Sequence, residues 1–196
     1  MAEQSFLDTL KDAIRKNEGT PKTRNAAQWF RRKMGALRAE LKNKFSQADT
    51  ADEFYTKSKK SKPTTISPGV MAAYFYDPKT KQQMKYYDRF PLIMCVQMYN
   101  NGFLGLNFHY LPPMLRANLM DNLDKAKSLN WKALIKIKQI KPTVKRYLWS
   151  HISSKVVLID DDEKNIALFL PTERFKKENK LVVWNDSRSM IYWHYQ

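Results

Sequence analysis

Four consecutive acidic residues at positions 160 to 163 form the densest group of side chains in this sequence that could carry out catalysis. Lys164 follows them, so the carboxylates could hold Mg²⁺ while the lysine stabilises a phosphate, as in a metal-dependent nuclease. Four adjacent acids on an extended chain cannot all face one ion, however. In a turn between two apolar segments they are most simply solvated. We therefore expect no metal site and no nuclease activity at this segment.

Histidine and cysteine, which also serve as metal ligands and catalytic groups, are few and scattered. His109, His151 and His194 lie too far apart in sequence to form a local ligand pair. The single cysteine, Cys95, can form neither an intrachain disulfide nor a cysteine-rich zinc site. Strand alternation would place His109 on the same face as Asn107, where we expect a hydrogen-bonded structural histidine rather than a catalytic one.

The remaining catalytic signals are weak. Asp88 beside Arg89 could be an acid next to a basic group, but we favour an aspartate that organises the turn before a strand, with Arg89 as its partner. The five glycines nowhere form a phosphate-binding loop of the G-x-x-x-x-G-K or G-x-G-x-x-G type. We expect a non-enzymatic protein without a cofactor, a metal or a small-molecule substrate.

Aromatic residues are abundant, with 10 Tyr, 10 Phe and 5 Trp, and several lie in clusters such as 74–76, 86–87 and 193–195. Aromatic side chains flanked by positive charge can stack on the bases of a nucleic-acid strand. Core packing and subunit contacts are commoner uses. Trp193 and Tyr195 are the best stacking candidates, because a chain end rarely forms the core. This apolar content suffices for a folded core and excludes a wholly disordered basic tail.

Positive charge is the most informative property of the composition. The chain has 35 Lys and Arg against 19 Asp and Glu, a formal net charge of +16 over 196 residues. Such a surface attracts phosphate backbones without reading sequence, and this binding weakens steeply with salt. An acidic protein assembly or a membrane surface could attract it equally. Because no base-reading motif accompanies the charge, we expect non-specific contact with double-stranded DNA.

Membrane insertion and secretion are not expected. The longest uninterrupted apolar stretch, residues 92–96, is far shorter than the roughly 18 residues that a membrane-spanning helix needs. The first ten residues lack the basic start, apolar run and cleavage site of a secretory signal. We therefore expect a protein that is assembled inside a cell and has no membrane partner.

Residues 1–69 are predicted to form a basic helical arm and linker. Apolar residues at three- and four-residue steps predict an amphipathic helix over 26–45, and one edge of it is cationic. Residues 50–68, with many Lys, Ser and Thr and two prolines, predict a solvated linker. A second basic stretch over 132–146 predicts a half-buried strand whose lysines face solvent. The cations expected to contact DNA are Arg31, Arg32, Arg38, Lys42, Lys59, Lys60, Lys62, Lys136 and Lys138.

Residues 70–196 are predicted to form the folded body. Strand-like runs over 91–99 and 103–111 flank Asn101-Gly102, a strong hairpin signal because both residues tolerate positive φ. The pattern predicts an α+β fold, with a small antiparallel β-barrel-like domain and flanking helices, preceded by basic N-terminal helices. The other predicted elements are a strand over 70–76, a helix over 114–123, a second hairpin of strands 156–159 and 166–170 around the acidic segment, and a short helix from about Thr172.

Four strings, taken together and in this order, resemble a known family. They are YYDRFPL at 86–92, GFLGLNFHYLPP at 102–113, ALFLPTERF at 167–175 and VWNDSR at 183–188. They resemble the DNA end protector proteins of T-even-like and cyanobacterial myophages, over roughly residues 70–190. The resemblance implies a virion protein, incorporated around head completion, that associates with the packaged DNA end and shields it from host exonuclease. It provides no catalytic motif to transfer.

The resemblance and the charge together imply a phage virion component, assembled in the host cytoplasm, that binds double-stranded DNA and other virion proteins. The alternative is a structural subunit of the phage neck, tail or baseplate whose charge meets acidic protein neighbours. Within the resembling strings, the residues expected to have architectural roles are Asp88, Pro91, Gly102, Asn107, His109 and Pro112.

Overall fold

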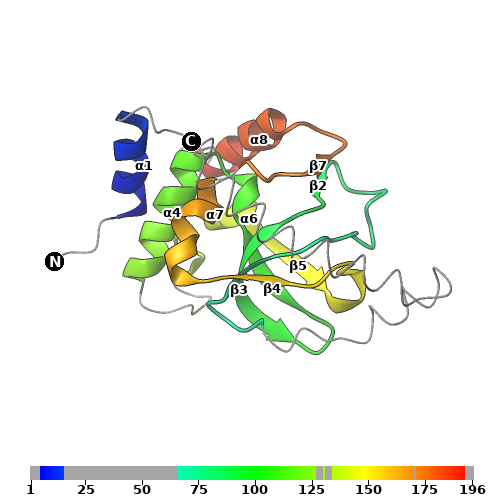
Figure 1. Ribbon diagram of the computed structural model, residues 1–196. Coiled ribbons are helices and arrows are strands. Elements are labelled where there is room, and N and C mark those ends of the chain that lie inside the picture. The colour runs from blue at the N-terminus through cyan, green and yellow to red at the C-terminus, as the bar shows by residue number, and fades with distance from the viewer. Residues whose placement is uncertain (1–4, 16–65, 127–129, 131–133, 170, 193–196) are drawn as a thin grey trace, which may run out of the picture.

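The computed structural model describes residues 5–15, 66–126, 130, 134–169 and 171–192. These residues form an α+β fold, as the sequence predicts, in which helices pack against antiparallel strands (Figure 1). The predicted helix over 26–45 and the linker up to residue 65 lie outside the described residues. The boundary between arm and body at residue 69 therefore stays a prediction.

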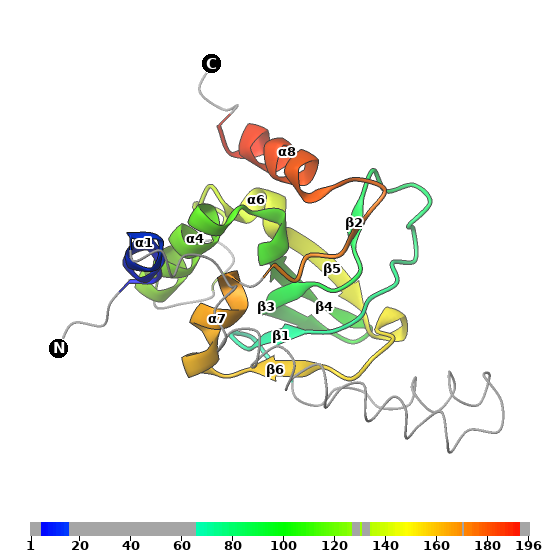
Figure 2. The ribbon, with the colours of Figure 1, turned by 45° about the horizontal axis from the view of Figure 1, so that its top comes forward.

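The main sheet has five antiparallel strands in the order β5-β4-β3-β1-β6, and among the described residues it is open, with β5 and β6 at its edges (Figure 2). The predicted barrel-like closure is wrong. Helices cover the apolar face of the sheet, so burial there does not require the sheet to close on itself. The strands are β1 (Met71–Ala73), β3 (Leu92–Tyr99), β4 (Gly102–Asn107), β5 (Val144–Leu148) and β6 (Val157–Ile159).

The β3–β4 hairpin is confirmed, but for a different reason from the one that the sequence suggests. Tyr99 pairs with Gly102, so Asn100 and Asn101 form the two-residue loop, and neither has a positive φ. Gly102 instead lies where a Cβ atom would come within 1.8 Å of the carbonyl oxygen of Tyr147 on β5. Glycine is required there because β5 approaches β4 so closely.

The returning strand is shorter than predicted, and the helix after it is confirmed. Strand β4 ends at Asn107, whose side-chain oxygen accepts a hydrogen bond of 3.0 Å from the N–H of His109. That contact starts the short 3-10 helix η1 (Phe108–Tyr110). Helix α4 (Pro113–Lys125) then begins with a proline, which fits a first helical turn because its missing N–H has no helical partner.

Residues 160–176 differ most from the sequence prediction. The acidic segment forms no hairpin turn: Asp160 and Glu163 make a capping box that begins the 3-10 helix η3 (Asp161–Glu163) and helix α7 (Lys164–Phe169). The helix expected from Thr172 is also wrong. Phe175–Lys176 forms strand β7, which pairs with β2 (Tyr87–Asp88), and helix α8 (Lys180–Tyr192) follows.

The predicted strand over 132–146 begins later than expected. Residues 135–139 form turns that lead into the short helix α6 (Ile140–Thr143). Pro142 has no N–H for a strand ladder, so pairing starts beyond it, at Val144 in β5. Lys136 and Lys138 are exposed, as expected, but on turns rather than on a strand.

Helix α1 (Phe6–Arg15) joins the N-terminal end of the chain to the body by packing against α4. Asp121 on α4 accepts hydrogen bonds from the N–H groups of Phe6, at 2.7 Å, and Leu7, at 3.2 Å. These are helix-start donors with no partner inside α1, and the carboxylate also faces the positive end of the helix dipole. Leu10 completes the contact as a buried side chain.

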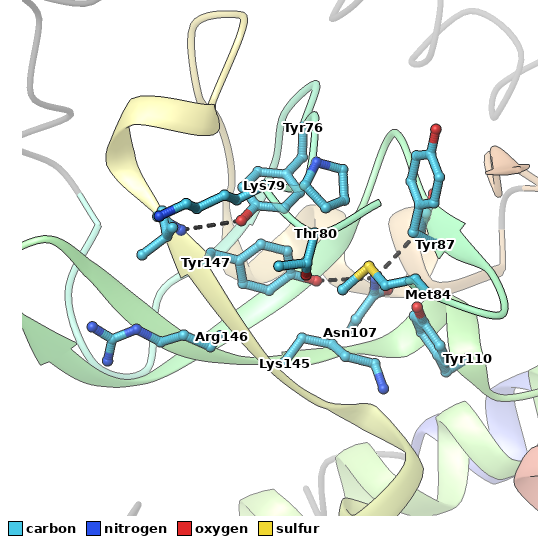
Figure 3. Close-up of a pocket in the computed structure, with 13 residues that line it drawn as sticks. Tyr76, Lys79, Thr80, Met84, Tyr87, Asn107, Tyr110, Lys145, Arg146 and Tyr147 are labelled. Carbon is cyan, nitrogen blue, oxygen red and sulfur yellow. Dashed lines mark hydrogen bonds between the residues drawn. The ribbon is translucent and has the colours of Figure 1, made fainter. Parts of the chain in front are cut away.

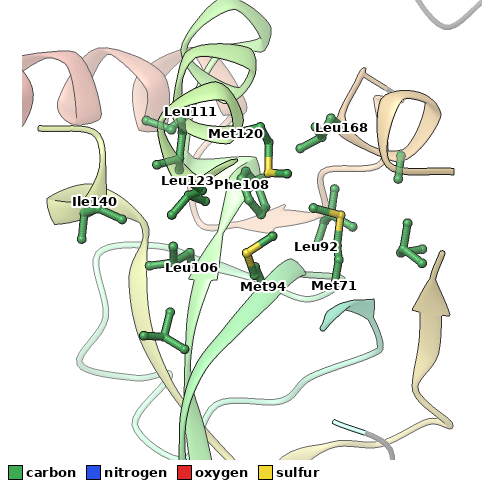
Figure 4. Packing of buried hydrophobic residues seen from close by; sticks show 14 of the residues in the cluster. Met71, Leu92, Met94, Leu106, Phe108, Leu111, Met120, Leu123, Ile140 and Leu168 are labelled. Carbon is green, nitrogen blue, oxygen red and sulfur yellow. The ribbon is translucent and has the colours of Figure 1, made fainter. Parts of the chain in front are cut away.

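The sheet is covered on both faces. Helices α4, α6 and α7 lie over one face, where residues such as Leu106, Met120 and Leu168 are fully buried (Figure 4). The other face has an aromatic cluster in which the ring centroids of Tyr76 and Tyr147 lie 4.9 Å apart, edge to face. This aromatic face positions the candidate site, because β5 contributes Tyr147 to it at the sheet edge.

Candidate functional site

A cavity of about 320 Å³ lies against strand β5, on the aromatic face of the sheet (Figure 3). We call it the β5 pocket. Its walls are strand β5, the segment 76–87 and Tyr110 of η1, and Asp88 and Asn107 also line it. Its lining combines tyrosine rings with the cations Lys79, Lys145 and Arg146.

Strand β5 places a lysine inside the pocket. Lys145 and Tyr147 alternate along β5 and therefore face the same side, opposite Gly105 and Phe103 of β4. The Lys145 Nζ lies 4.1 Å from the centroid of the Tyr110 ring, a cation–π contact. Burial lowers the pKa of Lys145 to about 8.

The next residue of the strand, Arg146, points away from Lys145 (Figure 3). Its guanidinium lies 3.7 Å from the centroid of the Tyr99 ring and donates a hydrogen bond to the side-chain oxygen of Asn101. It is exposed, so it adds positive charge to the outer side of β5.

Two tyrosine hydroxyls at the pocket are tied to the sheet by hydrogen bonds. The Tyr76 hydroxyl accepts a hydrogen bond of 3.2 Å from the N–H of Leu148, and the Tyr147 hydroxyl accepts one of 3.1 Å from Asn107 Nδ2. Burial raises the pKa of Tyr76, Tyr110 and Tyr147. These groups therefore add no negative charge near Lys145 at neutral pH.

The segment 77–86 forms the outer wall and is held by contacts with the C-terminal part of the chain. Lys177 Nζ donates to the carbonyl oxygens of Gln82, at 2.9 Å, and Met84, at 2.7 Å. Lys85 forms an ion pair of 2.7 Å with Asp186 on α8. Lys177 itself has a φ of 74°, a left-handed conformation that its two side-chain contacts help to maintain. The wall is thus fixed by residues about 100 positions away along the chain.

Behind the pocket, Asp88 forms the centre of a buried polar network. Its carboxylate lies 2.7 Å from His109 Nδ1 and accepts from the N–H groups of Phe90, at 3.0 Å, and Arg174, at 3.2 Å. Asn107 Nδ2 donates to it at 3.3 Å. Burial alone would raise the pKa of Asp88, but the charge and hydrogen bond of His109, with the other donors, hold it below its ordinary value.

The network links an aspartate, a histidine and a hydroxyl in a row. Asp88 contacts His109 Nδ1, and His109 Nε2 is 3.0 Å from Thr172 Oγ1. That order resembles a catalytic triad. His109 is fully buried and Thr172 is 8 % exposed, however, as in a structural network. The network fastens the segment before β7 to the sheet. The expected hydrogen-bonded histidine is confirmed, whereas Arg89, the expected partner of Asp88, is exposed, and His109 takes that place.

A second buried cation, Arg116 on α4, ties three segments together. Its guanidinium donates to the carbonyl oxygens of Leu111, at 2.7 Å, and Leu168, at 2.9 Å, and pairs with Glu173. Arg116 is fully buried, so a charge there is stable only with such partners. Together, Asp88 and Arg116 hold Leu168, Glu173 and Arg174 against the body, with β7 next to β2.

The residues that the sequence singled out for chemistry or DNA contact are dispersed. Lys136 and Lys138 are exposed and do not line the pocket. Asp161 pairs with Lys164 at 2.6 Å, and within the described ranges no three His, Cys, Asp or Glu side chains are grouped to hold a metal ion. Trp193, Tyr195 and the N-terminal cations lie outside the described residues; those cations are Arg31, Arg32, Arg38, Lys42, Lys59, Lys60 and Lys62.

The pocket cations themselves were missed from the sequence. Lys145 lies in the basic stretch over 132–146, whose lysines are expected to face solvent. The alternation of Lys145 with Tyr147 was a usable signal, since it places a cation and an aromatic ring on one strand face. Nothing local indicated that Tyr110 would lie against that lysine, because a 3-10 helix and a separate strand bring them together.

The described residues thus form a helix-and-sheet fold with a basic, tyrosine-lined pocket. The family described as phage T4 terminal DNA protecting protein matches residues 2–187. The chain therefore belongs to this family of phage DNA-end protecting proteins. Searches of curated proteins and of solved structures gave no match. None of the helices in the described ranges is long and apolar enough to cross a membrane.

Proposed function

We propose that this protein binds the end of packaged phage DNA during head completion and protects it from exonuclease without catalysis. The family match over residues 2–187 carries this proposal. The formal charge of +16 supports it, because a phosphate backbone is the most abundant anionic partner inside a phage particle. In this function the protein is a virion component that acts by occupying the DNA terminus.

Protection requires only that the bound protein exclude a nuclease from the terminal phosphodiester bonds. The charge suits this task, since phosphate contacts position a protein on DNA without depending on sequence. We propose that the N-terminal cations supply much of this contact and that Lys136 and Lys138 extend it. The N-terminal cations are Arg31, Arg32, Arg38, Lys42, Lys59, Lys60 and Lys62.

Other virion proteins are the second class of partner that we propose. Helix α8 exposes Leu181 and Tyr192, which are 61 % and 58 % exposed. These residues lie three turns apart on one side of the helix, next to the basic Arg188. Apolar side chains aligned in this way suit contact with a protein surface better than contact with phosphates. The contact would seat the DNA-bound protein in the particle.

An exonuclease-protection assay tests the function. Linear double-stranded DNA with free ends is incubated with the protein and a double-strand exonuclease, and DNA blocked at both ends serves as the control substrate. We expect full-length DNA to survive at a low ratio of protein to ends. Digestion at an unchanged rate under saturating protein would refute the proposal. In that case the neck, tail or baseplate role would account for the charge.

A further inference from the structure

We propose that the β5 pocket receives the terminal nucleotide of a DNA strand, with the base against the tyrosine rings and the phosphate at Lys145. This inference rests on the proposed function and adds how the protein would distinguish an end from internal DNA. It concerns a site that is separate from the N-terminal cations.

The size of the pocket limits what it can hold. At about 320 Å³ it lies at the lower limit of small-ligand sites, which range from about 300 to 1,000 Å³. A single nucleotide unit suits that space, and a base-paired duplex does not. The walls on both sides, β5 and the segment 77–86, are fixed by strand pairing and by the Lys177 contacts.

The lining suits a base. Tyr76, Tyr87 and Tyr110 border the cavity together with the apolar side chains of Pro78 and Met84. Aromatic rings bind bases of any identity, because every base offers a π-face. The neighbouring Asn107 is already committed to Asp88 and Tyr147, so it offers little sequence readout.

The charge suits a phosphate. Lys145 is half-buried, and its ammonium group contacts the Tyr110 ring. Asp88, the carboxylate that lines the pocket, already accepts hydrogen bonds from four groups. Lys79, which is exposed, adds a second cation. A phosphate would give Lys145 an anionic partner, and its negative charge would raise again the pKa that burial lowers to about 8.

A pocket for one nucleotide selects ends by geometry. A base inside a duplex is stacked on two sides and must be flipped out of the helix to enter such a pocket. The base at a free terminus has one stacking neighbour, so fewer contacts are broken when it leaves the stack. Internal DNA would therefore bind only to the outer cations, whereas an end would bind to these and to the pocket.

The test compares two duplexes of equal sequence and length, in a competition binding assay with the full chain. One duplex has free ends with 5′-phosphates, and the other has both ends closed by hairpin loops. We expect wild-type protein to prefer the free-ended duplex. Lys145→Gln should weaken binding to free ends by about tenfold, the value of one charged hydrogen bond, and leave binding to closed DNA unchanged.

Thr80→Trp provides a second variant that keeps every charge. Thr80 is an exposed pocket residue, so an indole there should fill the cavity without disturbing the core, and the preference for free ends should disappear. Gln83→Trp is the matched control: it is exposed on the same segment, does not line the pocket and should keep the preference. Lys136→Gln, a charge control outside the pocket, should weaken binding to both duplexes equally.

Equal binding of the two duplexes by wild-type protein would overturn the pocket proposal, as would a Thr80→Trp variant that keeps the wild-type preference. Exonuclease protection is measured on the same preparations, which separates the two proposals. Protection without a preference for free ends would contradict the pocket proposal and support the protective function. A preference for free ends without protection would support the pocket proposal and contradict the protective function.

Discussion

At the scale of single residues, the most constrained group is Asp88. It accepts hydrogen bonds from residues 90, 107, 109 and 174, which belong to three separate parts of the chain. A buried carboxylate is stable only when its charge is matched in this way. Residue identity at this position therefore affects both the β2–β7 pairing and the floor of the β5 pocket.

Asp88→Asn should reduce the free energy of unfolding by about 3 kcal/mol, because it leaves His109 and two backbone N–H groups with a weaker partner. Urea unfolding measures the change. Because the folded-state pKa of Asp88 is lowered, the wild-type contribution is present above the unfolded pKa of about 3.9 and lost as pH falls through the folded pKa. The difference between the two proteins should therefore shrink in acid. Asp77→Asn, at an exposed ion pair, should leave the urea midpoint almost unchanged.

Several residue-scale features could be predicted from sequence and others could not. The hydrogen-bonded role of His109 followed from the local pattern around Asn107. Its partnership with Asp88 did not, since the two are 21 positions apart and meet only when the sheet and β2 are in place. Asp160 and Glu163 have the spacing of a capping box, which indicates the start of a helix. The apolar runs on either side favour a hairpin turn instead, and this is why the helix is not expected from the sequence.

At the scale of elements, strand β5 determines the candidate site. It pairs with β4 alone in the described sheet, where Phe103 lies opposite Tyr147 and Gly105 opposite Lys145. The hairpin signal correctly indicated β3 and β4. It could not indicate β5 as their neighbour, because strand order depends on contacts about 40 residues apart along the chain.

Gly102→Ala should destabilise the fold by about 3 kcal/mol, because the new Cβ atom would lie 1.8 Å from the Tyr147 carbonyl oxygen and would push β5 away from β4. We expect faster amide hydrogen exchange along β5 and a lower melting temperature. Gly105→Ala is the control, since its nearest contacts would be at 3.4 Å. If both variants had the same stability, close approach of β5 would not explain the glycine.

At the scale of the whole molecule, the described residues form an open sheet between helices and an aromatic cluster. The fold class was predictable, because residues 70–196 contain both helical and strand-like periods but not the βαβ alternation of a parallel sheet. The expected barrel was not found, since periodicity does not show how the edges and faces of a sheet are covered. Helices α4, α6 and α7 cover a face that barrel closure would otherwise have to bury.

The N-terminal cations should contribute to the salt dependence of DNA binding. Replacing Arg31, Arg32, Arg38 and Lys42 together with Gln should lower the slope of log affinity against log salt by up to about 4, if each contacts one phosphate. Binding measured from low to physiological salt gives this slope, and circular dichroism shows whether the variant is folded. An unchanged slope would assign the phosphate contacts to other cations of the chain.

The volume of the β5 pocket has a consequence for stoichiometry. In the proposed binding mode, a cavity of about 320 Å³ engages one strand terminus, so occupancy follows the number of DNA molecules and not their total mass. Cutting a fixed quantity of DNA into shorter pieces would then raise the amount of protein bound at the ends in proportion to the number of pieces. A genome of any length would be served by a few copies.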